Sequence, residues 1–151
     1  GAHGWDHADW NGTFYPEDLP EEWRLNYYSN EFSGVLVPEV VWRKADPEVV
    51  AGWCDEVAEG FLFFLESAGS GESDRPVTAY QDLFGLHWGG VPIADIAVMS
   101  AEQKWDLRRL RERFELLMAQ QEGVVVPGFF VGGNPPNIER LREARLLADM
   151  L

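Results

Sequence analysis

The sequence has 151 residues, of which 46% are hydrophobic and 25% charged, a balance typical of one globular domain long enough to bury a core. Its net charge of −14 would repel phosphate groups, which excludes nucleic acid and anionic membranes as partners and leaves a basic protein as the alternative to a purely solubilising surface. No apolar run approaches the length of a membrane span, and the single cysteine, Cys54, excludes an internal disulfide framework and predicts a reducing, cytoplasmic compartment.

The first predicted element is a helix that begins in the acidic, Pro-containing segment 18–22. Trp23, Tyr27 and Tyr28 follow at helical spacing and are expected on one face. Residues 35–37 then form a short apolar run that is typical of a buried strand.

A second helix and strand follow. Asp46 and Pro47 have the pattern of a helix cap and first helical residue, and this helix is expected to end near Ala58. Residues 61–65 are uninterruptedly apolar, which indicates a strand buried on both faces, as in parallel α/β sheets. A loop is expected over 68–74.

The C-terminal half continues the alternation of helices and strands. A helix is expected over 77–87, ending at Gly89 and Gly90, and a strand within 93–99. A helix over 101–121 is opened by a capping box of Ser100 and Gln103. A bent strand over 124–131 and a last helix from Asn134 or Asn137 to Leu151 complete the chain. Such alternation predicts an α/β fold with a mostly parallel sheet of about five strands.

The opening residues carry a dense pattern of Trp, Gly, Tyr and Pro. The pattern reads Gly4-Trp5, then Trp10-Asn11-Gly12-Thr13-Phe14-Tyr15-Pro16, then a helix with Trp23, Tyr27 and Tyr28, and then Phe32. It resembles the signature of the YecE-like family, also catalogued as domain of unknown function 72, whose biochemical role is unsettled. The resemblance implies a TIM-barrel-like (β/α) fold.

At two strand ends the sequence differs from the pattern of that family. The polar pattern that the family carries on its second strand is replaced here around Glu39, and Glu66 stands where the third strand usually ends in a lysine-containing turn. A complete barrel needs about 250 residues. We therefore expect residues 1–151 to be one incomplete domain whose first strand is truncated upstream of residue 1.

Two correspondences are open for the second half. Residues 91–131 are expected to supply strand four, helix four and strand five; the alternative is that residues 129–151 are the last strand and helix of the barrel after an internal deletion. An open sheet edge predicts a homo-oligomer or cover by the final helix.

In barrel proteins the sites gather at the carboxyl ends of the strands. The candidate catalytic residues there are His3, Asp6, His7 and Glu66, with Glu66 and Asp6 expected to face His3 across the mouth. The candidate ligand-binding residues are Trp5, Trp10, Tyr15, Glu39 and Trp42.

Metal and cofactor sites are not predicted. His3 and His7 with nearby aspartates have the composition of a metal site, but they lie on a Gly-rich loop that lacks ligand geometry. Gly132-Gly133-Asn134-Pro135 precedes a helix like a phosphate loop, yet its prolines have no N–H to donate, so a turn is expected.

The shortened architecture and the altered strand ends favour a non-catalytic or degenerate binding or interaction protein. The alternative is an acid–base, hydrolase-like enzyme acting on a small polar substrate at the mouth of the strands. A third possibility is a structural subunit that docks through its open sheet edge.

Overall fold

The computed structural model describes residues 1–67, 77–92, 97–100, 103–119, 128–133 and 135–150. The strands are β1 (Ala2–His3), β2 (Gly34–Val37), β3 (Leu62–Leu65), β4 (Trp88–Gly90), β5 (Val98–Met99) and β6 (Phe130–Val131). The helices are α1 (Arg24–Glu31), α2 (Glu39–Trp42), α3 (Pro47–Glu56), α4 (Val77–Phe84), α6 (Leu107–Ala119) and α7 (Ile138–Met150), with 3-10 turns at η1 (Ala8–Trp10), η2 (Glu21–Trp23) and η3 (Gly85–His87).

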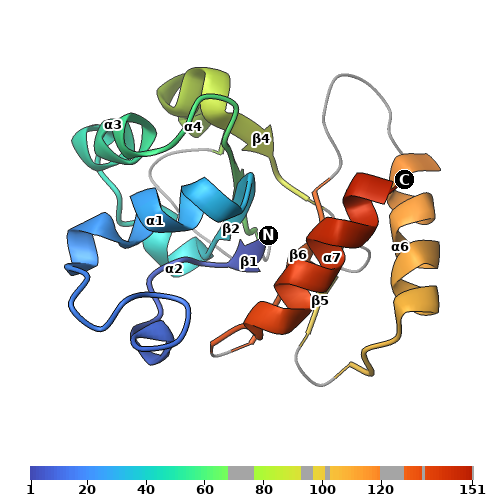
Figure 1. Ribbon diagram of the computed structural model, residues 1–151. Coiled ribbons are helices and arrows are strands. Elements are labelled where there is room, and N and C mark those ends of the chain that lie inside the picture. Colours follow the sequence, from blue (N-terminus) through green and yellow to red (C-terminus); the bar gives the residue numbers. More distant parts are fainter. Residues whose placement is uncertain (68–76, 93–96, 101–102, 120–127, 134, 151) are drawn as a thin grey trace.

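The strands form one parallel sheet in the order β4-β3-β2-β1-β6-β5. The sheet is curled, and helices lie along its outer side (Figure 1). The predicted α/β class and the incomplete TIM-barrel-like architecture are confirmed, with six parallel strands instead of about five. Whether the first strand extends upstream of β1 stays a prediction.

The position of β6 decides which part of a barrel the second half represents. In a TIM barrel, strands that are consecutive in sequence are neighbours, and the last strand closes on the first. Here β6 pairs with β1, and β5 pairs with β6. β5 and β6 therefore occupy the places of the last two strands. The expectation that 91–131 supplies strands four and five is wrong, and the internal-deletion alternative agrees with the topology.

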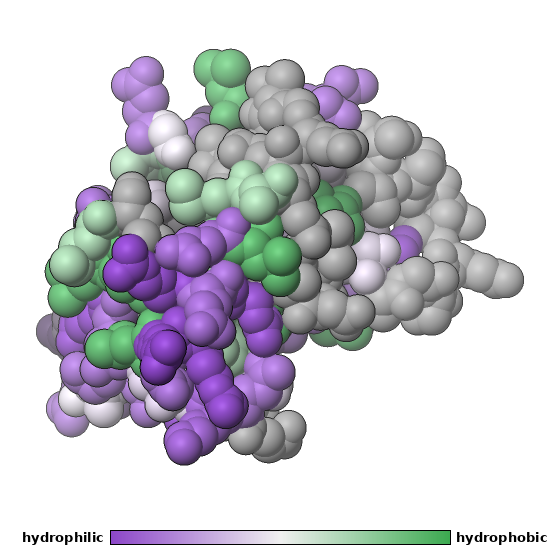
Figure 2. Space-filling model, turned by 90° about the vertical axis from the view of Figure 1, so that its right-hand side faces the viewer, coloured by the Kyte–Doolittle hydropathy of each residue, from purple (hydrophilic) through white to green (hydrophobic). Residues whose placement is uncertain are grey.

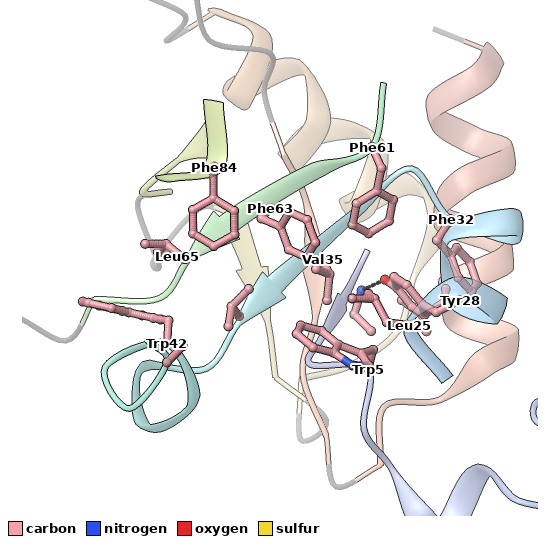
Figure 3. Close-up of a cluster of buried hydrophobic side chains, with 14 of the residues drawn as sticks. Trp5, Leu25, Tyr28, Phe32, Val35, Trp42, Phe61, Phe63, Leu65 and Phe84 are labelled. Carbon is pink, nitrogen blue, oxygen red and sulfur yellow. Dashed lines mark hydrogen bonds between the residues drawn. The ribbon is translucent and has the colours of Figure 1, made fainter. Parts of the chain in front are cut away.

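The outer face of the sheet packs against the helices. Side chains alternate along β2 and β3, so that Val35 and Phe63 point outward. They meet Leu25 and Tyr28 of α1 in a continuous buried cluster (Figure 3). Large aromatic rings supply most of this cluster, and each buried ring contributes about 1.5–3 kcal/mol relative to its exposed state.

The inner face of the sheet buries a second, smaller cluster. Leu36 of β2, Phe64 of β3 and Phe130 of β6 pack together across the curl, and the two rings lie 4.9 Å apart. A Cβ at Gly89 or Gly128 would come within 3.0 Å of the Phe64 ring, so glycine at both positions leaves room for it. The strands are thus buried on both faces, as the apolar run at 61–65 predicted.

Two elements differ from their predicted bounds. The α6 helix begins at Leu107, six residues after the predicted start, because Asp106 caps it by accepting the N–H of Arg108 at 2.9 Å. The Gln103 side chain does accept the N–H of Ser100 at 3.0 Å, but this bond lies ahead of the helix. Trp88–Gly90 is strand β4, where only a helix stop was expected.

The face of the predicted first helix also differs. Trp23 is 59% exposed and Tyr27 is 37% exposed, whereas Tyr28 is fully buried. The last helix begins as one alternative predicted, because Asn137 accepts the N–H of Arg140 at 3.1 Å. The other alternative, Asn134, all of the expected loop 68–74, and parts of the expected segments 93–99 and 124–131 lie outside the described residues.

The surface of α6 and α7 carries both charged side chains and exposed apolar ones such as Leu116 and Leu146. In the view of Figure 2, hydrophilic side chains gather densely on one part of this side, with smaller hydrophobic patches beside them. Arg111 and Glu115 of α6 form an exposed ion pair at 3.3 Å, as expected for a solvated helix face. None of the helices in the described ranges is long and apolar enough to cross a membrane.

Candidate ligand site at the carboxyl ends of the strands

His3 and Glu66 meet at the carboxyl ends of β1 and β3. His3 is in register with Leu36, so the two residues share the inner face of the sheet, and Glu66 lies two residues beyond Phe64 of the same face. The His3 Nε2 atom lies 2.7 Å from Glu66 Oε2. The sequence analysis placed both residues here, and the structure brings them together.

The backbone around β2 and α2 holds Glu66 in place. Its N–H donates to the carbonyl of Val37 at 3.0 Å, and its own carbonyl accepts the indole N–H of Trp42 at 2.8 Å. The carboxylate oxygen Oε1 accepts the backbone N–H of Glu39 at 3.2 Å. Both ends of the residue are therefore fixed, and only Oε2 faces His3.

Glu39, a predicted ligand-binding residue, lies beside this pair with its own counter-ion. Arg43 donates through Nε to Glu39 Oε1 at 2.7 Å, and its guanidinium lies 4.3 Å from the centroid of the Trp42 ring. The Glu39 side chain is 14% exposed. Its carboxylate is thus largely buried and neutralised by the arginine.

The imidazole of His3 is not satisfied by Glu66 alone. The side chain is 30% exposed, and that of Glu66 is 38% exposed. Although the two atoms lie at ion-pair distance, Nε2 of His3 makes no aligned hydrogen bond within the described part of the chain. The Nε2 atom itself is enclosed, so the accessible part of the pair is the rest of the imidazole and the Glu66 side chain.

His7 supports the loop instead of completing the pair. Its Nε2–H donates to the carbonyl of His3 at 3.0 Å. Burial lowers the pKa of His7 below its usual value, an effect that hydrogen bonds to the carbonyls of His3 and Gly4 partly offset. His7 therefore acts as a neutral donor that fixes the backbone after β1.

Asp6 does not line the mouth with Glu66 in the way that was expected. It accepts from Arg24 at 2.5 Å, and the Arg24 guanidinium also reaches Asn11 at 3.4 Å. Arg24 is only 5% exposed, and its Nε has no hydrogen-bond partner among the described residues. Arg24 was not predicted as a site residue. It is the first residue of α1, and the pattern of a helix does not show that the loop after β1 folds back onto it.

The aromatic residues of the opening pattern are buried in the structure. The hydroxyl of Tyr15 donates to the carbonyl of Trp5 at 2.5 Å, and the indole N–H of Trp10 donates to the carbonyl of Pro136 at 3.0 Å. These bonds fold the loop after β1 and tie it to the segment before α7. Trp5, Trp10, Tyr15 and Trp42 are each less than one tenth exposed and belong to the buried cluster on the outer face of the sheet, so their direct contact with a ligand stays a prediction.

Two hollows lie near the sheet. A cleft of about 360 Å³ opens outside the strands, beside the loops that follow β1 and β2. A mainly apolar hollow of about 430 Å³ includes Gly34 and Leu62 at the opposite, amino ends of the strands, away from His3 and Glu66. Within the described ranges, no group of three His, Cys, Asp or Glu residues is arranged to hold a metal ion.

Comparison with known families matches the N-terminal part of the chain. The model of the family described as protein of unknown function DUF72 matches residues 1–70. No curated protein and no solved structure matches the chain. The matched segment contains β1 to β3, and therefore both His3 and Glu66.

Proposed function

We propose that this chain binds a small polar ligand at the carboxyl ends of β1 to β3. The DUF72 family, whose model matches residues 1–70, is of unknown function, so the proposal rests on the site itself. The observation that carries the proposal is the pair of His3 and Glu66, 2.7 Å apart and partly exposed at the carboxyl ends of the strands. A ligand with hydroxyl, amide or carboxyl groups would hydrogen-bond to the exposed part of this pair.

The surrounding charges favour binding over catalysis. General acid–base chemistry commonly needs a second titrating group free to exchange a proton with the substrate. Asp6 is held by Arg24, and Glu39 is held by Arg43. The nearby carboxylates are thus engaged as structural counter-ions, which supports recognition with fixed polar contacts.

The proposal is tested on untagged protein taken directly from cells. Native mass spectrometry would show a bound small molecule, and saturation-transfer NMR with a panel of sugars, amino acids and carboxylic acids would give its class. We expect Glu66→Gln to weaken binding about tenfold or more, because it removes a charged hydrogen-bond acceptor. Glu59→Gln, an exposed acid beyond α3, is the matched control. Equal binding by the two variants would reject the site.

Acid–base catalysis is the second candidate, favoured by the same short distance between His3 and Glu66. A histidine beside a carboxylate can transfer protons between about pH 5 and 8. Turnover of a panel substrate that is abolished by both His3→Ala and Glu66→Gln would establish this candidate in place of simple binding. Turnover that survives both substitutions would exclude it.

A macromolecular partner remains compatible with a ligand site. The strands β4 and β5 are the edges of the described sheet, and the chain carries a net charge of −14. Both features support the proposal of a homo-oligomer or of a basic protein partner. Native mass spectrometry decides between them, because a dimer has twice the mass of the chain.

A further inference from the structure

The cleft of about 360 Å³ on the helix side of the sheet is lined by aromatic, aliphatic and acidic side chains. Trp5 and Trp53 stand edge to face with their centroids 5.1 Å apart, and both line the cleft. Leu25 of α1 and Val41 of α2 add apolar surface. The side-chain amide of Asn26 donates to the carbonyl of Glu56 at 2.7 Å, which links α1 to α3.

The charge around the cleft is unbalanced. Glu21, Glu22 and Glu56 line it, and none of them forms an ion pair within the described part of the chain. Asp6 also lines it but is neutralised by Arg24, and the low pKa of His7 leaves that imidazole uncharged near neutral pH.

No lysine or arginine is among the described residues that line the cleft, so three negative charges lack a counter-ion there. Partial burial and the charge of Glu22 raise the pKa of the Glu56 carboxyl above its usual value. This shift has the direction expected when carboxylates share a confined space without a cation.

We propose that this cleft binds an organic cation, an alkylammonium or guanidinium group on an aliphatic stem. The stem would lie against the indoles and the apolar side chains, and the charged head would lie between Glu22 and Glu56. Indole faces and carboxylates together are the usual surroundings of such cations in proteins. The cation comes either from a free amine or from the side chain of a basic protein.

This cleft is separate from the site proposed above. Neither His3 nor Glu66 lines it, so the two proposals can fail independently. His3→Ala is therefore expected to leave cation binding unchanged, whereas it alters binding at the strand ends.

The test follows the indole N–H signals of isotope-labelled protein in two-dimensional NMR spectra. The probes are butylammonium chloride, butylguanidinium chloride and the uncharged 1-butanol. We expect saturable shifts of the Trp5 and Trp53 signals with at least one cation at millimolar concentration, and no comparable effect of 1-butanol. Glu56→Gln should weaken binding about threefold, and the double Glu22→Gln/Glu56→Gln variant about tenfold.

Glu59→Gln is the control, because it removes the same charge from an exposed position outside the cleft. Its affinity should equal that of the unmodified chain. The proposal is overturned if neither cation causes a saturable shift, if 1-butanol acts equally well, or if Glu59→Gln and the double variant weaken binding alike.

A last comparison identifies the source of the cation. The blocked tripeptide acetyl-Ala-Lys-Ala-amide presents the same alkylammonium group on a peptide. Tighter binding of the tripeptide than of butylammonium supports a protein side chain as the ligand, and weaker binding supports a free amine.

Discussion

The hydroxyl of Tyr28 is the polar link between α1 and the first two strands. It accepts the N–H of Ala2 at 2.8 Å and donates to the carbonyl of Gly34 at 2.8 Å (Figure 3 shows the first bond). Burial raises the pKa of Tyr28 far above its usual value, so the phenol keeps the proton that it donates. Ala2 is fully buried and starts the strand that carries His3.

Tyr28→Phe would leave this buried N–H without a partner while keeping the ring. An unsatisfied buried donor costs about 1–3 kcal/mol, and the carbonyl of Gly34 loses one donor as well. We expect the free energy of unfolding to fall by about 2–3 kcal/mol, which corresponds to a decrease in Tm of about 5–10 °C for a chain of this length. Urea unfolding followed by circular dichroism measures the difference.

Tyr27→Phe is the control for this substitution. Tyr27 lies on the same helix but is 37% exposed, so loss of its hydroxyl should change stability by less than about 0.5 kcal/mol. A Tyr28→Phe variant that is no less stable than Tyr27→Phe would show that the two bonds do not anchor the first strand.

Three further predictions concern stability. Gly89→Ala should cost about 1–3 kcal/mol, because its Cβ would lie 2.8 Å from the Phe64 ring, whereas Gly52→Ala in α3, with nothing within 4 Å, should gain about 0.5–1 kcal/mol; thermal melts of the two variants test the contrast. Asp106→Ala should cost about 1 kcal/mol by removing the cap of α6, and unchanged urea midpoints would contradict it. Because burial lowers the pKa of His7, its imidazole binds a proton more readily in the unfolded state than in the folded state. The free energy of unfolding should therefore fall as pH drops below about 6.5. His7→Gln should reduce this pH dependence in urea titrations at several pH values.

The fold class could be predicted because it depends on local patterns. The run at 61–65 is apolar at every position, and a strand of that kind fits only a sheet covered on both sides. The rule that parallel strands end at one edge then placed His3 and Glu66 together without any knowledge of the contacts.

The elements that were missed depend on distant partners. Trp88-Gly89-Gly90 looks like a helix stop because its glycines have no side chain to pack. In the structure, Gly89 belongs to β4 because the Phe64 ring of the neighbouring strand fills the space that a side chain would need. The short pairing of β6 with β1 likewise joins residues about 130 positions apart, and no local pattern predicts it.

The strand order bears on how far the described strands enclose the proposed site. If β1 to β4 occupy the first four places of a barrel and β5 and β6 the last two, the missing strands are the fifth and sixth. In a closed barrel of eight strands, those two lie across the mouth from the first and second strands. His3 and Glu66 come from the first and third places, so the deletion spares both of them.

The loops that would follow strands five and six of a barrel are not among the described segments. Enzymes of this architecture draw catalytic groups from the ends of several strands and exclude water by closing the mouth. In the proposed site, the six described strands supply side chains from one side of the mouth. The proposed reversible binding therefore relies on residues that the described strands supply, whereas catalysis would need the opposite wall to be supplied by another part of the protein or by a partner.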